Sequence, residues 1–188
     1  MDDEQDVPAA ARLVRDFVNT REPQTDEEQL VTPDSLAAWL NGRGLLPPGA
    51  AVTASDLRRA VAVREGLRQV LLEHAGHEVD RGPLDELERE LAAVPVRVTL
   101  GAGGPRLVAA TSEPWHNALA GLLDAVRRSA QDGTWPRLKV CARDTCRWAF
   151  YDASRNQARR WCSMAGCGNH VKMKRAYAVR KQRTTGAG

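Results

Sequence analysis

Two pairs of cysteines, Cys141-Ala-Arg-Asp-Thr-Cys146 and Cys162-Ser-Met-Ala-Gly-Cys167, decide the fold of the C-terminal part of the chain. They hold all four cysteines of the 188 residues within a stretch of 27 residues. The pattern is C-x4-C-x15-C-x4-C, two pairs of equal spacing separated by an insert long enough for a β-hairpin. A segment of about 50 residues rarely builds a self-sufficient hydrophobic core, so this part needs another source of stability.

Four thiolates at this spacing predict a metal site. Thiolates are soft ligands, and four of them complete the tetrahedron of a structural zinc site with no position left open for water. We therefore expect one structural Zn²⁺ ion, held by Cys141, Cys146, Cys162 and Cys167. Two disulfides, four free thiols, an iron–sulfur cluster and an added role as a redox switch are alternatives, of which a reducing cytoplasm disfavours the disulfides.

The sequence around the cysteines predicts the elements of a small module. Residues 147–151 alternate in polarity as a β-strand does, and the residues after Cys167 are compatible with a continuous helix. A knuckle, a hairpin and a helix that begins at the last ligand are typical of treble-clef-like or zinc-ribbon-like modules. The aromatic residues of the insert are expected to pack inside the module: Trp148, Phe150, Tyr151 and Trp161.

The charge of the chain divides near Pro136. Residues 1–136 contain 14 Arg, no Lys and 22 acidic residues, which give a net charge of −8. Residues 137–188 contain 13 Lys and Arg and two acidic residues, which give a net charge of +11. The whole-chain value of +3 therefore hides two parts of opposite sign, and this asymmetry predicts a polyanionic partner for the basic part.

The N-terminal part is predicted to be mostly helical, because its apolar residues recur at helical spacing between Gly and Pro breaks. Helices are expected at 9–19, from Asp34 or Ser35 to Gly42, from an N-cap at Ser55 to Gly76, at 83–92 and at 113–131. Residues 96–100 and 106–110 predict a β-hairpin with a five-residue loop at 101–105. The predicted fold class is α+β and mostly α: a helical N-terminal domain with a small β-hairpin, followed by a small zinc module with four cysteine ligands.

These patterns predict a domain at residues 1–132, the zinc module at 137–183 and a disordered tail at 184–188. About 135 residues bury enough apolar surface to fold alone. No stretch approaches the roughly 18 apolar residues of a membrane span, and the acidic start lacks the basic and apolar regions of a signal peptide. We therefore expect a cytoplasmic protein without a membrane partner.

The residues around the cysteines resemble the CGNR zinc finger. The motif runs Cys141-x4-Cys146-Arg-Trp-x-Phe-Tyr-Asp-x-Ser-Arg-Asn-x-x-Arg-Arg-Trp-Cys162-Ser-Met-x-x-Cys167-Gly-Asn, which is long and specific. The N-terminal part is similar to the ABATE domain, which typically precedes this finger in bacterial, especially actinobacterial, regulators. That similarity lies in Asp16-Phe-Val-Asn-Thr20 and in Trp39-Leu40 before Gly44-Leu45.

The resemblance implies a stress-related transcription regulator, in which residues 137–183 bind DNA and residues 1–132 form a sensor domain gated by a small ligand. The ABATE-like stretch makes four residues the candidates for ligand contact: Asn19, Thr20, Arg21 and Trp39. An Asn-Thr pair after a helix is also typical of a helix C-cap. The motif departs from the family at its last position, where His170 replaces Arg and makes the charge conditional near neutral pH.

Basic residues of the C-terminal part are the candidates for DNA contact. A positive surface binds duplex DNA mainly through phosphates, and a helix fits the major groove. We expect the helix after Cys167 to be the recognition element, with Arg159 and Arg160 clamping a phosphate. The predicted DNA-binding residues are Arg155, Arg159, Arg160, Asn169, His170, Lys172, Lys174, Arg175, Arg180 and Lys181.

Other functions are open at this point. One is a protein-interaction or zinc- or redox-responsive module, in which the acidic domain docks on a partner or on the basic finger; another is binding of RNA instead of DNA. No Ser/His/Asp, Cys/His or paired-carboxylate arrangement has a usable spacing, so we do not expect an enzyme. A homodimer is one assembly that the sequence allows, although no coiled-coil pattern is present.

Overall fold

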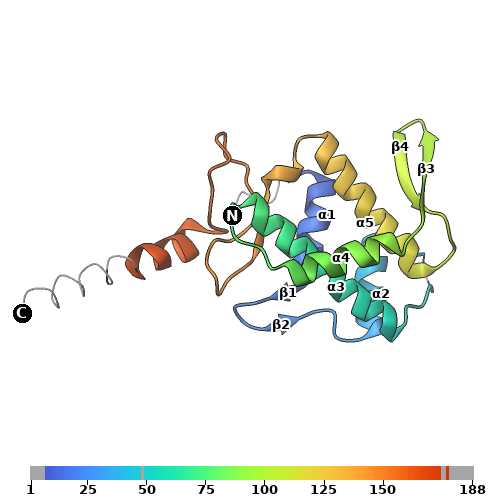
Figure 1. Ribbon diagram of the computed structural model, residues 1–188, viewed down its shortest axis with the longest axis horizontal. Helices are drawn as coiled ribbons and strands as arrows, with labels where there is room; N and C mark the ends of the chain where they lie inside the picture. The colour runs from blue at the N-terminus through green and yellow to red at the C-terminus, as the bar shows by residue number, and fades with distance from the viewer. Residues whose placement is uncertain (1–6, 48, 175–176, 178–188) are drawn as a thin grey trace, which may run out of the picture.

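The computed structural model is mainly helical, and it describes residues 7–47, 49–174 and 177 (Figure 1). Its elements in chain order are α1 (Ala9–Val18), β1 (Arg21–Glu22), β2 (Glu27–Glu28), α2 (Pro33–Asn41), α3 (Ala54–His74), α4 (Arg81–Ala92), β3 (Val96–Gly101), β4 (Gly104–Ala109), α5 (Pro114–Gln131), η1 (Trp135–Arg137), β5 (Leu138–Val140), β6 (Ala149–Tyr151) and η2 (Met164–Gly168). Residues 169–174 continue as a helix. The strands form three separate antiparallel pairs, β1–β2, β3–β4 and β5–β6.

The predicted fold class, α+β and mostly α with a small cysteine module, is confirmed. None of the helices in these described ranges is long and apolar enough to cross a membrane.

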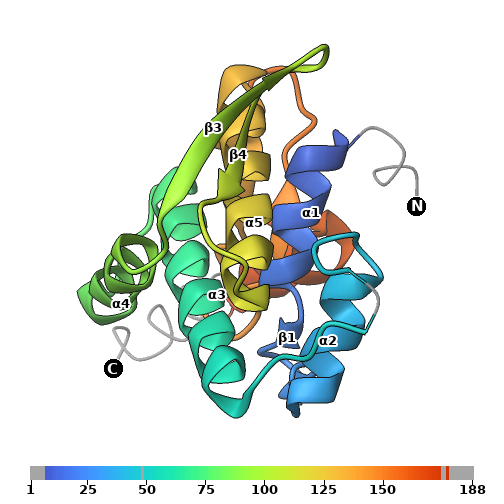
Figure 2. The ribbon, with the colours of Figure 1, turned by 90° about the vertical axis from the view of Figure 1, so that its right-hand side faces the viewer.

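Helices α1, α3 and α5 pack around one hydrophobic core (Figure 2). Phe17 of α1 and Leu119 and Leu122 of α5 are almost completely buried in it. Helix α4 packs on α3 at a very close approach. A side chain on Gly66 of α3 would place its Cβ 2.4 Å from the Cβ of Leu87 on α4, so this contact requires glycine.

The hydrophobic core continues into the basic part of the chain. Leu138 and Val140 of β5 and Ala149 of β6 are fully buried and belong to the same core as the N-terminal helices. Strand β5 contacts α3 and strand β6 contacts α1. The zinc module adds a small core of its own, formed by Cys141, Cys146 and Cys167 with Trp148, Trp161 and Cys162 packed against them. The β5–β6 pair therefore links the two cores.

Capping boxes fix the starts of α2 and α3. Thr53 Oγ1 accepts a hydrogen bond from the backbone N–H of Asp56 at 3.1 Å, and the Asp56 carboxylate accepts one from the backbone N–H of Thr53 at 2.8 Å. The predicted N-cap at Ser55 is therefore wrong by two residues, because the reciprocal Thr-Asp pair satisfies the free N–H groups better. Thr32 caps α2 in the same way with Ser35, ahead of the expected cap.

The β3–β4 hairpin is longer than predicted. Gly101 pairs with Gly104, and Leu100 pairs with Pro105, which leaves a two-residue loop at 102–103. The predicted five-residue loop is wrong because the glycines continue the ladder; Gly104 has a φ of +88°, which only glycine adopts readily.

Candidate metal centre and nucleic-acid interface

The four cysteine thiols converge on one point. Their Sγ atoms all lie within 4.8 Å of one another, and the neighbouring distances are 3.6 Å from Cys146 to Cys162 and 3.7 Å from Cys162 to Cys167. Zn–S bonds of about 2.3 Å in a tetrahedron separate the sulfurs by about 3.8 Å. The cysteines therefore fit one structural zinc ion, as the sequence predicts.

The protonation chemistry of the cluster favours a cation. The hydrogen bond with the Cys146 thiol lowers the pKa of Cys141 to about 2, and the same bond raises the pKa of Cys146 to about 12. Hydrogen bonds to Cys141 and Cys146 raise the pKa of the Cys162 thiol as well. One sulfur thus ionises easily while its neighbours resist a second negative charge. A bound Zn²⁺ ion removes this conflict, because each thiolate then faces a divalent cation.

Backbone hydrogen bonds place each pair of cysteines. The N–H of Cys141, directly after β5, donates to the carbonyl of Trp148 at 2.9 Å, and the N–H of Cys146 donates to the carbonyl of Arg143 at 2.9 Å. Arg147, directly after Cys146, has a φ of +51°, which turns the chain back toward β6. In the second pair, Ser163 caps η2 and orients the turn that carries Cys167.

Three side chains of the N-terminal part bond to residues at or just after the first cysteine pair. The Asn19 amide donates to the carbonyl of Ala149 at 2.8 Å and accepts from its N–H at 2.8 Å, so it pairs with β6 as a neighbouring strand residue would. Arg68 of α3 donates to the carbonyl of Arg147 at 2.9 Å. Gln24 donates to the Sγ of Cys146 at 3.5 Å. The geometry of the first pair therefore depends on the N-terminal domain.

Asn19→Ala is expected to destabilise the protein by about 2–4 kcal/mol, because the substitution leaves the buried N–H and carbonyl of Ala149 without partners. Urea unfolding followed by circular dichroism measures the loss. Asn19→Asp is the matched control: its carboxylate still accepts from the N–H of Ala149 but cannot donate to the carbonyl. An unchanged unfolding midpoint for Asn19→Ala contradicts this role.

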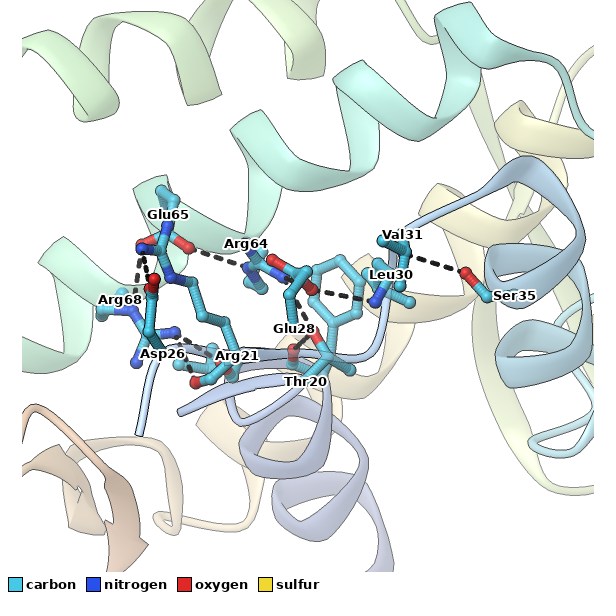
Figure 3. Close-up of polar contacts among 12 residues, drawn as sticks. Thr20, Arg21, Asp26, Glu28, Leu30, Val31, Ser35, Arg64, Glu65 and Arg68 are labelled. Carbon is cyan, nitrogen blue, oxygen red and sulfur yellow. Dashed lines mark hydrogen bonds and ion pairs between the residues drawn. The ribbon is translucent and has the colours of Figure 1, made fainter. Parts of the chain in front are cut away.

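A buried polar network joins α3 to the end of α1 (Figure 3). The Arg64 guanidinium donates to Glu28 at 2.7 Å, to Glu65 at 2.8 Å and to Thr20 Oγ1 at 3.2 Å. Arg68 donates to Glu65 at 3.0 Å. Burial raises the pKa of Glu28, but the hydrogen bonds from Arg64 and the Leu30 N–H outweigh it and hold the pKa below its usual value. No sequence pattern predicts a role for these two arginines, although both lie among the buried residues of α3.

The four residues predicted to contact a ligand take different positions. Asn19 caps α1 and lines a pocket of about 400 Å³ between the N-terminal helices and the zinc module. Thr20 is buried and donates to the carbonyl of Phe17, while exposed Arg21 pairs with Asp26 at 2.8 Å. Trp39 packs against Phe17 with ring centroids 5.3 Å apart. Asn19, Thr20 and Arg21 thus follow one another at the end of α1, whereas Trp39 lies on α2.

A basic groove of about 490 Å³ lies beside the zinc site, between the first cysteine pair and the C-terminal helix. Its lining joins segments distant in sequence, and four of the lining residues are basic: Arg143, Arg160, His170 and Lys174. Asp144, Thr145 and Trp161 complete the polar and aromatic part of the wall, and the Asp144 carboxylate pairs with Arg147 at 2.9 Å. The groove therefore brings together Arg160, His170 and Lys174 from the predicted DNA-binding set and adds Arg143, which is not in that set.

The other predicted DNA-binding residues lie outside this groove. Arg155, Asn169 and Lys172 are exposed or partly exposed. Arg159 donates to the carbonyl of Trp161 at 3.0 Å, lies over the Phe150 ring at 5.2 Å and lines the 400 Å³ pocket instead of the groove. The remaining three lie outside the described residues: Arg175, Arg180 and Lys181.

Part of the positive charge in this region is structural. Lys139 and Asp152 form a buried ion pair at 2.9 Å. Burial raises the pKa of Asp152, but hydrogen bonds from Ser154 and Lys139 hold it below its usual value. Asp152 also accepts from the backbone N–H of Arg159 at 3.0 Å. Asp152 thus fixes the loop that leads to Arg160.

Comparison with known families agrees with this arrangement. The model of the CGNR zinc finger matches residues 137–180. The model of the ABATE family, described as "Putative stress-induced transcription regulator", matches residues 11–146, which is more than half of the chain. No curated protein gives a significant match. The chain therefore belongs to the ABATE family and carries a C-terminal CGNR zinc finger.

Proposed function

We propose that this protein is a bacterial transcription regulator that binds DNA through its zinc module. The basic groove carries this proposal, because Arg143, Arg160, His170 and Lys174 meet there from separate segments. Zinc holds these segments together and so sets the spacing of the charges. A surface of this kind binds the phosphates of duplex DNA and releases their counterions.

The C-terminal helix supplies the element that would enter the DNA. Residues 169–174 extend away from the helical core (Figure 1). Three residues of this segment line the groove: His170, Val171 and Lys174. An α-helix fits the major groove, and Asn169 and His170 lie at the start of this helix, where side chains can reach base edges. Phosphate contacts in the groove would set the orientation of the helix on the duplex.

The family supports a regulator and not an enzyme, since the ABATE description is that of a transcription regulator and the second match is a zinc finger. In this proposal residues 1–132 form the sensor domain and residues 137–183 the DNA-binding domain, working in the cytoplasm. The hydrogen bonds of Asn19 to Ala149, of Gln24 to Cys146 and of Arg68 to Arg147 connect the proposed sensor domain directly to the zinc module that carries the groove.

Arg160→Ala/Lys174→Ala is expected to weaken binding of the full-length, zinc-loaded protein to duplex DNA by about 50-fold at about 0.1 M salt. Each phosphate contact contributes about 0.9 to the slope of log K against log salt, so two lost contacts lower the slope by about 2. Fluorescence anisotropy with a labelled duplex, repeated over a salt series, measures both numbers. His170→Arg restores the residue of the family motif and is expected to strengthen binding, because a guanidinium stays charged at every working pH and forms two parallel hydrogen bonds to a phosphate.

Arg58→Ala/Arg97→Ala is the matched control, because it removes two exposed charges from α3 and β3, away from the groove. Wild-type affinity and an unchanged salt slope for the groove variant would falsify the proposed interface. A labelled single-stranded RNA of the same length, bound more tightly than the duplex, would instead identify RNA as the partner.

A further inference from the structure

The 400 Å³ pocket between the N-terminal helices and the zinc module has the composition of a binding site. Its wall combines Arg15 and Asp16 of α1, Arg43 after α2, the β6 residues and the zinc ligand Cys162. Ligand pockets commonly measure about 300–1,000 Å³ and commonly lie where domains meet. This pocket fits both conditions.

The charges of the pocket favour an anion. Three arginines line it, Arg15, Arg43 and Arg159, against one carboxylate, that of Asp16. Asp16 pairs with Arg15 at 2.8 Å. The Arg43 guanidinium is exposed and stacks on the Trp39 ring at 3.9 Å. Arg43 Nη1 donates to the carbonyl of Trp39 at 3.5 Å, and among the described residues no ion pair within 4.0 Å occupies this guanidinium, so it can pair with the carboxylate of a ligand.

The remaining wall of the pocket is aromatic. Trp148, Phe150 and Tyr151 line the side formed by the zinc module, and Trp148 and Tyr151 are only partly buried. Aromatic side chains bind planar apolar groups through large contact areas and offset stacking. A molecule that suits both sides of the pocket therefore carries a carboxylate at one end and a planar ring at the other.

We propose that this pocket binds a small aromatic carboxylate, with its carboxylate at Arg43 and Arg15 and its ring against Trp148 and Tyr151. Such a ligand would touch α1, β6 and the loop of Cys162 at once. It would therefore fix the position of the zinc module relative to the N-terminal helices. This regulatory step rests on the proposed function, whereas binding of the ligand does not.

Isothermal titration of the zinc-loaded full-length protein with benzoate, phenylacetate and the neutral analogue benzamide tests the site. We expect saturable binding of at least one carboxylate with a Kd of about 1 mM or tighter, within the range that so few ligand atoms allow. Benzamide should bind at least about tenfold more weakly, because it cannot form the ion pair. Saturation by neither carboxylate overturns the proposal.

Two variants of opposite expected effect locate the ligand. Arg43→Gln is expected to weaken carboxylate binding about tenfold, and Asp16→Asn to strengthen it several-fold, because the latter removes the competing carboxylate from Arg15. Arg106→Gln is the control, since Arg106 lines a neighbouring pocket together with Arg43 but not this one. Equal binding by wild type and Arg43→Gln, or a larger loss for Arg106→Gln, overturns the assignment to this pocket.

A separate measurement tests the regulatory step. The affinity for labelled duplex DNA, measured with and without a saturating concentration of the bound carboxylate, is expected to change at least about threefold. Saturable carboxylate binding with an unchanged DNA affinity keeps the binding site and overturns its regulatory role. Absence of any DNA binding overturns the proposed function and leaves the titration result intact.

Discussion

Removal of zinc is expected to unfold the zinc module and to lower the melting temperature of the whole chain. Structural zinc in finger peptides contributes an apparent free energy of about 10–16 kcal/mol, which equals or exceeds the total stability of a typical domain. The small core here consists of the cysteines themselves with Trp148 and Trp161 packed against them. Without the ion that core has little else to hold it, and the crowded thiols repel a second negative charge.

Near-ultraviolet circular dichroism follows this loss, because Trp148 and Trp161 lie against the cysteines. A strong zinc chelator should remove their signal, and added Zn²⁺, but not Mg²⁺, should restore it. Cys146→Ser should give the same spectrum without a chelator, while the helical far-ultraviolet signal of α1 to α5 largely persists. Stoichiometric zinc and a native spectrum in Cys146→Ser would mean that the four sulfurs do not share one ion.

Arg64→Met is expected to lower the free energy of unfolding by about 3 kcal/mol. The Arg64 side chain is only 1% exposed, and its removal leaves Glu28, Glu65 and the buried Thr20 hydroxyl without their common donor. Breaking a buried ion pair on one side costs about 3–5 kcal/mol, and the partial exposure of both glutamates places this case near the lower limit. Urea unfolding measures the change.

Arg58→Met on the same helix is the control, because Arg58 is more exposed and the substitution should change stability by less than about 0.5 kcal/mol. Glu28→Gln in the Arg64→Met background should recover part of the loss, since it removes the carboxylate that Arg64 pairs with, whereas Glu65 keeps its ion pair with Arg68. An Arg64→Met protein as stable as the wild type would show that the network contributes nothing to the fold.

The zinc ligands could be predicted from the sequence because all four cysteines lie within one short segment with a regular spacing. The long helices could be predicted for a similar reason, since their apolar periodicity persists over several turns. The exact first residues of the helices could not be predicted, because each start depends on a single side-chain hydrogen bond. At α3, for example, both Thr53 and Ser55 are residue types that cap helices, and the hydrogen bond forms at Thr53. The hairpin loop depended on the freedom of Gly104 to continue the ladder.

The polar network around Arg64 and the 400 Å³ pocket could not be predicted from the sequence. Arg64 is buried because Glu28 reaches it from β2, and a strand of two residues leaves no periodic signal in the sequence. The pocket joins side chains from Arg15 to Cys162, which meet only when the whole chain is folded. Strand β5 could not be predicted for a related reason, because it has only three residues and gives no periodic signal. It begins where the net charge of the chain changes sign, but it packs against α3 and so belongs to the main core.

The burial of Leu138, Val140 and Ala149 among the N-terminal helices has a consequence for protein engineering. A cut after Cys141 separates β6 from β5 and from α1, and it leaves the Asn19 amide without the backbone groups of Ala149 that it pairs with. A chimera in which another zinc module replaces this one should therefore keep the chain intact through Tyr151 and exchange only the residues that follow it.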